Sequence, residues 1–356
     1  MRIAILGSVA LPIPPPAQGG TEWIAYHQAK GLAEKGHDIL LIAAKGTAKH
    51  FTEQKTIRVL EIGGGDVVVG SNRSIRYDPA TTEASRFLRK EIVYLSQVMQ
   101  VLIDQKGSYD IILNNMRGEA VFIQIAQMLQ KPFINVMHLN LFVELADLFR
   151  QHKTHVITIS NAQRKDFPDL SYLATVYNGV DTTQFSFNAA PNEYLLMMGT
   201  IGRHKNQKEA ITVAKEAGMK LILAGKVRDQ DYFEELKKDI DGEQIQYFGE
   251  LSFDQKLKLY QEAKAFIFPI AWEEPFGLVM IEAMSCGTPV VAYNKGAVSE
   301  VVIDGLTGYV VDNHIQMVEA IKKVTTIKRE DCRKQVEDNF TIEHMIAAYE
   351  KALVSL

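Results

Sequence analysis

Residues 272–291 read WEEPFGLVMIEAMSCGTPVV, and this stretch decides how the fold is interpreted. Pro275 suits the first position of a helix and Gly287 suits its end. The positions between them are apolar on every side apart from Glu282, which predicts a buried helix that carries one charge. Because a buried carboxylate without partners is costly, we expect Glu282 to be hydrogen-bonded.

A second carboxylate, Glu274, lies just outside the predicted start of this helix, where backbone N–H groups favour anions. One interpretation makes Glu274 a helix cap and pairs Glu282 with a basic neighbour. The other gives both carboxylates to the hydroxyls of a sugar and a ribose, with phosphate at the bare N–H groups of the helix. The residues by themselves leave both interpretations open.

The segment EPFGLVMIEAMSCGTPVV resembles the E-x7-E donor motif of the family 4 retaining glycosyltransferases. The resemblance implies that Glu274 holds the donor sugar and Glu282 the ribose of a nucleoside diphosphate sugar. It also places Phe276, Gly277 and Leu278 in the donor site. The implied fold is α/β of the GT-B type, in which two doubly wound, Rossmann-like domains face a central cleft.

Length and composition are those of an ordinary globular protein. At 356 residues the chain is long for one hydrophobic core, so two domains are expected. The start, MRIAILGSVAL, is interpreted as a buried first strand and not as a signal peptide. Two cysteines predict neither a disulfide framework nor a metal cluster. We therefore expect a cytoplasmic protein. Peripheral contact with the surface of a membrane is compatible with this location.

Short apolar runs alternate with helical periods along the chain, which predicts parallel sheets covered on both faces. The expected domains are residues 1–180, on the acceptor side by resemblance, and residues 181–340, which bind the donor. The resemblance also implies that a last helix within residues 341–356 packs back on the first domain. Residues 161–167 are expected to form a helix. Ligands are expected at the carboxyl ends of the strands.

A pair of glycines, Gly19 and Gly20, opens the helix after the first strand, in the sequence LPIPPPAQGGTEW. Glycines let the backbone approach a ligand closely, and a helix start favours phosphate. A stiff connector that ends in a flexible cap is the structural alternative. The resemblance favours function, because family 4 enzymes carry a glycine pair here beside the donor diphosphate.

Two further strand ends carry polar side chains. His138 ends the strand FINVMH, where an imidazole can donate a hydrogen bond to a sugar hydroxyl or a phosphate. A lone histidine is ordinarily structural, but this one matches the family's strand-end histidine beside the donor sugar and is expected to act in catalysis with Glu274. Asn115 and Arg117 follow an earlier strand and are expected on the acceptor side, although turn chemistry explains the asparagine as well.

The chain departs from the family pattern after the first strand of the second domain. Family members usually read G-R-[IL]-x-x-E-K there, and the arginine and lysine clamp the donor diphosphate. This chain reads MGTIGRHKN, so Gly199 and Lys205 match while Thr200 replaces the arginine. Our hypothesis is that Arg203, in the same loop, supplies the missing charge. A solvent-exposed loop arginine is the alternative.

Neither a metal nor a cofactor is expected. No Asp-x-Asp follows a strand end in a diphosphate context, and the histidines are scattered. Lys205, an arginine and helix N-termini would neutralise the leaving diphosphate instead. The net charge of −4, without a clustered basic stripe, gives no reason to expect nucleic acid as a partner. A local basic group is either a solvated helix face or a contact for an anionic acceptor or a membrane surface. Its members are Arg73, Arg76, Arg86, Arg89 and Lys90.

The sequence thus predicts a retaining, metal-independent glycosyltransferase of the hexosyltransferase type. It would move a sugar from a nucleotide diphosphate sugar, with uridine or guanosine as the base, to an acceptor hydroxyl. The acceptor is a saccharide, a lipid-linked molecule or a small molecule, and the residues do not choose among these. Two alternatives stay open: a GT-B-type sugar-nucleotide epimerase, which needs no acceptor, and a noncatalytic sugar-nucleotide-binding module.

Overall fold

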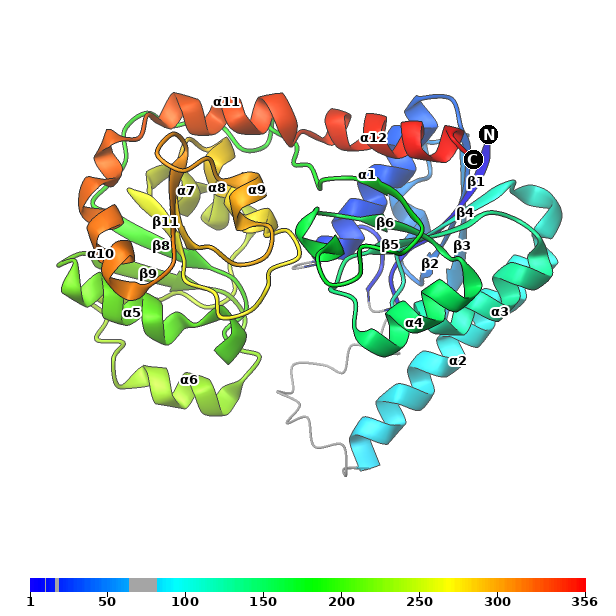
Figure 1. Ribbon diagram of the computed structural model, residues 1–356, viewed down its shortest axis with the longest axis horizontal. Helices are drawn as coiled ribbons and strands as arrows, with labels where there is room; N and C mark the ends of the chain where they lie inside the picture. Colours follow the sequence, from blue (N-terminus) through cyan, green and yellow to red (C-terminus); the bar gives the residue numbers. More distant parts are fainter. Residues whose placement is uncertain (10, 17–18, 64–81) are drawn as a thin grey trace. The chain divides into compact units, whose positions relative to one another are not determined.

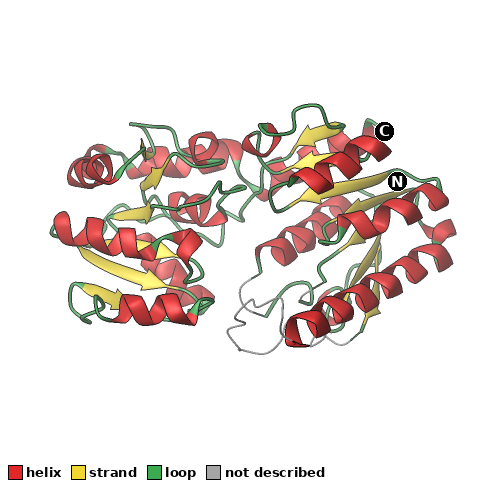
Figure 2. Ribbon diagram, turned by 60° about the horizontal axis from the view of Figure 1, so that its bottom comes forward, coloured by secondary structure: helices red, strands yellow, loops and turns green. Residues whose placement is uncertain are grey.

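The computed structural model describes residues 1–9, 11–16, 19–63 and 82–356. These residues divide into two compact units. The first contains the described residues up to Tyr177 together with Ile342–Leu356, and the second contains Asn178–Thr341. Each unit is a sheet with helices on both faces (Figure 1; Figure 2). The predicted doubly wound α/β architecture is therefore confirmed for each unit.

The first unit is built on a parallel sheet whose described strands follow the order β3-β2-β1-β4-β5-β6-β7. The order reverses direction between β1 and β4, which is the switch point where doubly wound sheets bind ligands. Central strands are buried along almost their whole length, because helices cover both faces. The strands are β1 (Arg2–Leu6), β2 (Asp38–Ala44), β3 (Ile57–Ile62), β4 (Ile111–Asn114), β5 (Phe133–Met137), β6 (His155–Thr158) and β7 (Tyr172–Thr175).

Alternate residues of these strands point to opposite faces of the sheet. Leu40 and Ile112 belong to the core beneath the second and third helices, whereas Ile39 and Ile3 are buried on the other face. The helices are α1 (Gly20–Glu34), α2 (Thr82–Asp104), α3 (Glu119–Leu129), α4 (Val143–His152) and α12 (Ile342–Val354), with the 3₁₀ turns η1 (Ala48–His50), η2 (Lys106–Ser108) and η3 (Ala162–Arg164).

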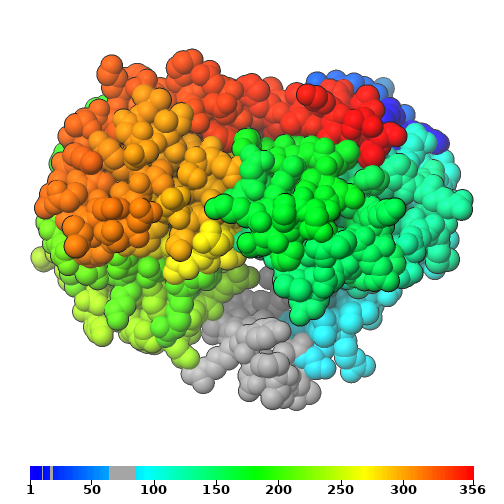
Figure 3. Space-filling model, in the orientation of Figure 1, coloured from blue at the N-terminus to red at the C-terminus, as the bar shows by residue number. Residues whose placement is uncertain are grey.

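The C-terminal helix α12 packs against α1 within the first unit, where its red surface lies beside the blue N-terminal segment (Figure 3). A Cβ on Gly31 would come within 2.5 Å of Ile346, so the glycine permits the close approach of the two helices. Glu350 accepts hydrogen bonds from Lys35, at 2.8 Å, and from the ring of His37, at 3.3 Å. The chain end is thus fixed by both packing and charge.

The second unit has a parallel sheet in the order β10-β9-β8-β11-β12-β13 among the described strands. A continuous apolar core joins its strands to the helices that follow β8, β9 and β13. The strands are β8 (Tyr194–Met198), β9 (Lys220–Ala224), β10 (Ile245–Tyr247), β11 (Ala265–Phe268), β12 (Val290–Tyr293) and β13 (Gly308–Val311). The helices are α5 (Gln207–Glu216), α6 (Gln230–Lys237), α7 (Phe253–Glu262), α8 (Leu278–Ser285), α9 (Val298–Val301), α10 (His314–Lys323) and α11 (Arg329–Asn339), with η4 (Arg203–Lys205) and η5 (Val324–Thr326).

The helix expected to begin at Pro275 begins instead at Leu278, and its N-cap is Gly277 with a positive φ of 85°. The expected start was wrong because the carbonyl of Glu274 accepts a hydrogen bond from Ala297 N–H at 2.9 Å, so it does not serve a helical turn. The predicted end is confirmed, since Gly287 has a φ of 86° directly after the helix.

The helix expected at residues 161–167 was also wrong, because this segment contains the single 3₁₀ turn η3. Gln163 uses its side-chain amide on the backbone of Met137 and Ile159, which fixes the turn in a nonhelical path. The apolar and helical periods did not reveal β7, α4, α9 or α11. Strand β7 is half-buried along its length at the edge of the sheet, so its sequence lacks the continuous apolar run of a central strand.

Candidate functional site

Four loops at the carboxyl ends of parallel strands bring charged side chains together in the second unit. Residues 199–206 follow β8, residues 225–229 follow β9, residues 269–277 follow β11 and residues 294–297 follow β12. Backbone bonds join the first and third of these loops, since Ala271 N–H donates to the carbonyl of His204 at 3.0 Å. Doubly wound domains bind ligands at the carboxyl ends of their strands, so this edge of the sheet is a candidate ligand site.

Glu274 is held in this edge by two donors. Lys205 Nζ lies 2.6 Å from Glu274 Oε2, and Trp272 Nε1 donates to the same oxygen at 2.9 Å. The side chains of Glu274 and Lys205 are 11% and 16% exposed, so the ion pair is largely shielded from solvent. The N-cap of α8 has no side-chain cap bond, and thus Glu274 does not act as that cap. Its carboxylate is positioned by these neighbours, and its Oε1 accepts no hydrogen bond from the residues that the structure describes.

The backbone beneath Glu274 is supported by the loop after β12. Ala297 N–H binds the Glu274 carbonyl, and Gly296 N–H donates to the Glu273 carboxylate at 2.6 Å. A Cβ on Gly296 would lie 2.1 Å from the Glu274 carbonyl oxygen, and its φ is 58°. A glycine is therefore required at 296 for the chain to approach Glu274 so closely.

Glu282 also has the partners that a half-buried carboxylate needs. Lys256 Nζ lies 2.9 Å from its Oε1, and the Tyr260 hydroxyl donates to its Oε2 at 2.8 Å. Burial first, and then the adjacent carboxylate, raise the pKa of Tyr260 well above its usual value, so the hydroxyl stays protonated and remains a donor. Both partners come from α7. The expected hydrogen bonding of Glu282 is confirmed, and the basic neighbour of the structural interpretation is Lys256.

Between the two carboxylates lies the start of α8, whose first N–H groups have no acceptor within a helix. Gly277 and Leu278 occupy this position. Phe276 differs from them, because its ring is 2% exposed and packs edge-on against Phe340, with centroids 5.9 Å apart. Phe276 thus shapes the start of the helix from the core, and its side chain is not presented to a ligand.

Arg203 is bound to α6 in this structure. Its guanidinium donates to both carboxylate oxygens of Glu235, lies 3.8 Å from Asp229 and stacks over the ring of Tyr232. These partners hold the arginine on acidic side chains, whereas Lys205 in the same short turn points to Glu274. The proposed transfer of the missing charge to Arg203 therefore requires the arginine to leave an existing ion pair.

The predicted residues of the first unit form a separate network at the ends of β1, β4 and β5. Asn115 is buried and donates to Gln28 at 2.7 Å, and its Oδ1 lies 2.9 Å from His138 Nε2. Arg117 is not part of this network, since it binds Glu91 of α2 at 2.8 Å. The structure thus joins Asn115 to His138 and directs Arg117 elsewhere.

The neighbouring start of α1 carries the glycine pair. Gly19 is its N-cap and Gly20 its first residue. Glu22, in the first turn, is 5% exposed and accepts a hydrogen bond from Ser8 Oγ. A Cβ on Gly19 would come within 2.7 Å of the Glu22 carboxylate. The predicted phosphate position therefore already has one buried carboxylate near it, a residue that the sequence analysis did not single out.

The hydrogen bond to Asn115 fixes the protonation of His138. An amide oxygen can only accept, so Nε2 carries the proton. Desolvation lowers the pKa of His138 from 6.5 to about 4, which keeps the ring neutral at pH 7. Nδ1 is then an acceptor. The expectation that His138 donates to a ligand needs this correction: the donor nitrogen is used by Asn115, and Nδ1 can accept a hydrogen bond from a hydroxyl.

This depressed pKa predicts a pH dependence of stability. The unfolded chain binds a proton at His138 below about pH 6.5, whereas the folded protein does not until about pH 4. The His138 contribution to the free energy of unfolding is thus complete above pH 6.5 and is lost as the pH falls toward 4. Urea unfolding at several pH values should show a smaller loss over this window in His138→Asn.

His314 is the matched control for that experiment. Glu216 and Glu209 raise the pKa of His314, so its contribution is present at low pH and is lost as the pH rises through its folded value. His314→Asn should therefore change the slope of the unfolding free energy against pH in the direction opposite to the change caused by His138→Asn. Equal slopes in wild type and His138→Asn would contradict the neutral, desolvated imidazole.

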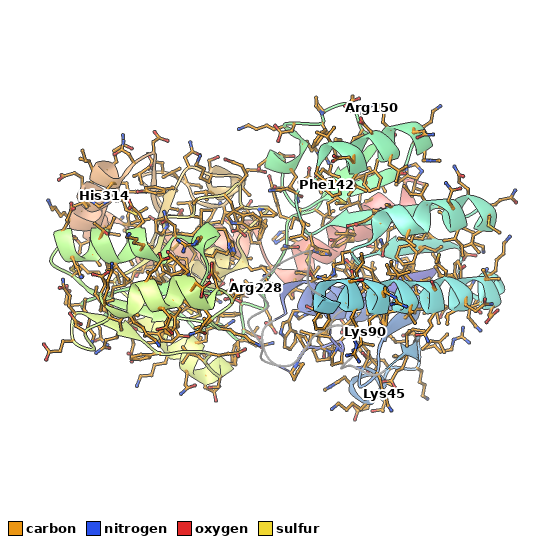
Figure 4. All side chains as sticks on the ribbon, turned by 90° about the horizontal axis from the view of Figure 1, so that it is seen from below. Lys45, Lys90, Phe142, Arg150, Arg228 and His314 are labelled. Carbon is orange, nitrogen blue, oxygen red and sulfur yellow. The ribbon has the colours of Figure 1, made fainter. Side chains whose placement is uncertain are left out.

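Three members of the predicted basic group, Arg86, Arg89 and Lys90, lie on α2. Arg86 and Arg89 are exposed there, beside the exposed apolar side chains of Leu88, Ile92 and Val93. Lys90 is labelled on this helix in Figure 4. Arg73 and Arg76 lie outside the described residues. None of the described helices is both long and apolar enough to cross a membrane. Contact of this face with a membrane surface or an anionic acceptor stays a prediction.

Among the described residues, no group of three or more histidine, cysteine, aspartate and glutamate side chains is arranged to hold a metal ion. Cys286 and Cys332 are free and buried, and burial raises the pKa of each thiol to about 12.

Sequence reasoning gave no role in the site to Lys256, Tyr260, Trp272 or Gly296. A signal for the first two was available, because Lys256 and Tyr260 stand four residues apart in FDQKLKLYQE and so share one face of α7. Their partner could not be read from that spacing. Together the observed contacts define a doubly wound domain with a carboxylate and a lysine at the strand ends and a second carboxylate on the following helix.

Comparison with known proteins identifies this domain. Residues 181–339 match the sequence profile of the family described as Glycosyl transferases group 1. This part of the chain belongs to that family, and the recognised resemblance to family 4 glycosyltransferases is confirmed for it. The matched residues contain Lys205, Glu274 and Glu282.

Individual relatives agree with this assignment. The glycogen synthase of Mycobacterium tuberculosis is 32% identical over 152 residues, which are 40% of this chain and 36% of that protein. The phosphatidyl-myo-inositol mannosyltransferase of Mycolicibacterium smegmatis is 22% identical over 339 residues, or 87% of this chain and 81% of that protein. Several other curated relatives are matched over 44–46% of their length, so the chain spans less than half of them.

Solved structures extend the likeness of the fold to the whole chain. Anabaena Alr3699/HepE, crystallised in complex with UDP-glucose, is similar with a TM-score of 0.72 and 18% identity over 100% of both chains. The predicted GT-B fold is thereby confirmed. The arrangement of the two domains around a cleft stays a prediction.

Proposed function

We propose that this chain is a retaining, metal-independent glycosyltransferase that moves a hexose from a nucleoside diphosphate sugar to an acceptor hydroxyl. The observation that carries the proposal is the placement of Glu274. This carboxylate is fixed by Lys205 and Trp272 at the strand ends of a domain that belongs to the glycosyl transferases group 1 family. A shielded carboxylate whose Oε1 has no donor among the described residues is suited to accept a hydrogen bond from a sugar hydroxyl.

Each neighbouring group then has a role in the reaction. Glu282 would accept from the ribose hydroxyls, while Lys205 and the amides of Gly277 and Leu278 would face the diphosphate. The bond between the anomeric carbon and the diphosphate oxygen breaks, and the acceptor oxygen bonds to the same face of the sugar. The leaving diphosphate takes the proton of the acceptor hydroxyl.

The first unit would contribute to the sugar side and the acceptor side. Gly19 and Gly20 present backbone at the start of α1, and the unprotonated Nδ1 of His138 would accept from a hydroxyl. Asn115 acts through His138 by holding Nε2, so it is a positioning residue. The likeness to a UDP-glucose complex supports uridine as the base, and the names of the relatives differ in acceptor, so the acceptor class is left open.

A donor panel tests this proposal. UDP-, GDP- and ADP-sugars are added to the purified protein, and the unfolding temperature is recorded. A donor at 100 times its dissociation constant stabilises the folded protein by about 2.7 kcal/mol, which is readily measured. Product analysis by NMR with candidate acceptors should show transfer with retained anomeric configuration, at the same rate with and without EDTA.

The other outcomes of this experiment would contradict all or part of the proposal. Conversion of the donor to its epimer without an acceptor would identify an epimerase, and tight binding without transfer or hydrolysis would identify a binding module. Loss of turnover in EDTA, restored by magnesium or manganese, would contradict the metal-independent mechanism. A protein that none of the donors stabilises would overturn the proposal as a whole.

A further inference from the structure

The loops after β8 and β9 are joined edge to edge, and this brings one arginine beside the position where the family's arginine is missing. Ile201 N–H donates to the Lys226 carbonyl at 2.9 Å, and Arg228 N–H donates to the Ile201 carbonyl at 3.1 Å. Residues 201 and 227 form an isolated parallel bridge. Arg228 is therefore fixed against the residue that follows Thr200.

The absence of a side chain at Gly225 lets the two loops approach each other at their start. A Cβ on Gly225 would lie 1.9 Å from the carbonyl oxygen of Gly199. Gly225 also has a φ of 142°, which other residues rarely adopt. The two loops thus leave their strands in close contact, and Arg228 belongs to the same strand-end edge of the sheet as the Lys205 turn.

Arg228 is uncommitted, in contrast to the other long cations of these loops. It is exposed, and its guanidinium has no ion pair or hydrogen bond with the residues that the structure describes. Figure 4 shows it at the surface of the second unit. Arg203 is bound by Glu235, and Lys205 is bound by Glu274. Arg228 can therefore reach a ligand without first breaking an ion pair.

The ring of His204 shows that Arg228 shares an electrostatic neighbourhood with the Glu274 site. Burial lowers the pKa of His204, and the positive charges of Lys205 and Arg228 lower it further, while Glu274 raises it. The ring also packs edge-on against Trp272, with centroids 5.5 Å apart. Trp272 in turn donates to Glu274. Arg228 and Glu274 thus act on the same ring, that of His204, from the two loops that carry them.

We propose that Arg228 binds the diphosphate of the donor together with Lys205. Arg228 would thus take the role of the family's arginine, which Thr200 replaces in this chain, and Arg203 would not. This inference rests on the proposed function and specifies one of its binding residues. A guanidinium grips phosphate through two parallel hydrogen bonds, whereas a lysine gives a single point charge. Arg228 thereby supplies the planar contact that Lys205 cannot.

The test measures nucleotide affinity by calorimetry, using whichever of UDP, GDP and ADP binds the wild type. Arg228→Ala is expected to weaken that nucleoside diphosphate by roughly 10- to 100-fold, the loss of a charge-assisted hydrogen bond. The corresponding nucleoside should bind as it does to the wild type. The affinity of Arg228→Lys should lie between those of the wild type and Arg228→Ala, because lysine keeps the charge but cannot form the two parallel hydrogen bonds of a guanidinium.

Two further variants complete the design. Lys334→Ala removes an equal charge from the exposed face of α11 and should leave the affinity unchanged. Thr200→Arg in the Arg228→Ala background returns a guanidinium to the adjacent residue and should restore most of the affinity. Thermal melts establish that each variant is folded, which is expected because Arg228 and Lys334 are both exposed.

The outcomes separate this inference from the proposed function. Wild-type affinity in Arg228→Ala overturns the inference and leaves the glycosyltransferase proposal standing. Equal losses for the nucleoside and the diphosphate also overturn it, since Arg228 would then only hold the loop. A large loss in Arg203→Ala without one in Arg228→Ala would return the role to Arg203. A wild type that binds none of the three nucleotides overturns both.

Discussion

Glu274→Gln is expected to lower turnover by roughly 100-fold to 1,000-fold, because removal of one preorganised electrostatic contact to a transition state typically costs about 2.7–4 kcal/mol. Glutamine keeps the shape of the side chain and can still accept from Trp272 Nε1. It loses the negative charge that binds Lys205 and that, on the proposed function, also contacts the donor sugar. Steady-state kinetics should show the loss mainly in kcat, with a smaller change in KM for the donor.

Glu273→Gln is the matched control for this substitution. The two carboxylates are adjacent in the chain, but the Glu273 side chain is 64% exposed and lies 3.7 Å from Lys295. Its glutamine can still accept from Gly296 N–H, so the loop after β12 should keep its position. We expect turnover close to that of the wild type. A comparable loss in both variants would mean that the reaction responds to general charge at this edge.

The structural alternative for Glu274 makes a different prediction. If the carboxylate only stabilises the fold through Lys205, Glu274→Gln should lower the unfolding temperature and leave kcat unchanged in the folded fraction. Breaking a shielded ion pair leaves Lys205 uncompensated, so some loss of stability is expected on either account. A folded, fully active Glu274→Gln protein is the result that would remove Glu274 from the reaction.

The strands whose bounds were predicted most accurately from the sequence are completely buried. Strand β5 and strand β8 are uniformly buried, and their apolar runs gave their bounds directly. Helix α8 was recognisable for the same reason. Strand β7 and helix α4 were missed because they are marginal: β7 is half-buried, and α4 begins beside the exposed side chains of Phe142 and Val143.

The part of the candidate site that could be predicted is the part that follows from the spacing of residues along the chain. The E-x7-E spacing places one carboxylate before a short helix and the other within it, and the sequence shows this without a structure. The direction of the Arg203 side chain depends on Glu235, thirty-two residues later in the chain, which spacing cannot supply. The same is true of Arg228, whose position follows from the pairing of two loops through Ile201 and Val227.

The second large effect concerns Glu282. Glu282→Gln is expected to weaken a nucleoside diphosphate by roughly 10- to 100-fold, since a hydrogen bond to a charged acceptor contributes about 1.5–3 kcal/mol. Glu282 also holds Lys256 and Tyr260, so a loss of affinity by itself would not tell ribose binding from support of α7. The experiment therefore needs a readout that a purely structural role does not move.

That readout is the preference for an intact ribose. Affinities for UDP and for its 2′,3′-dideoxy analogue, or the equivalent pair for the base that the wild type binds, are measured on both proteins. If Glu282 accepts from the ribose hydroxyls, the wild type prefers the intact ribose, and Glu282→Gln loses most of that preference. If Glu282 only supports Lys256 and Tyr260, both affinities fall together and the preference persists. The second pattern would contradict the ribose assignment, because removal of a partner for a hydroxyl must change how the protein discriminates that hydroxyl.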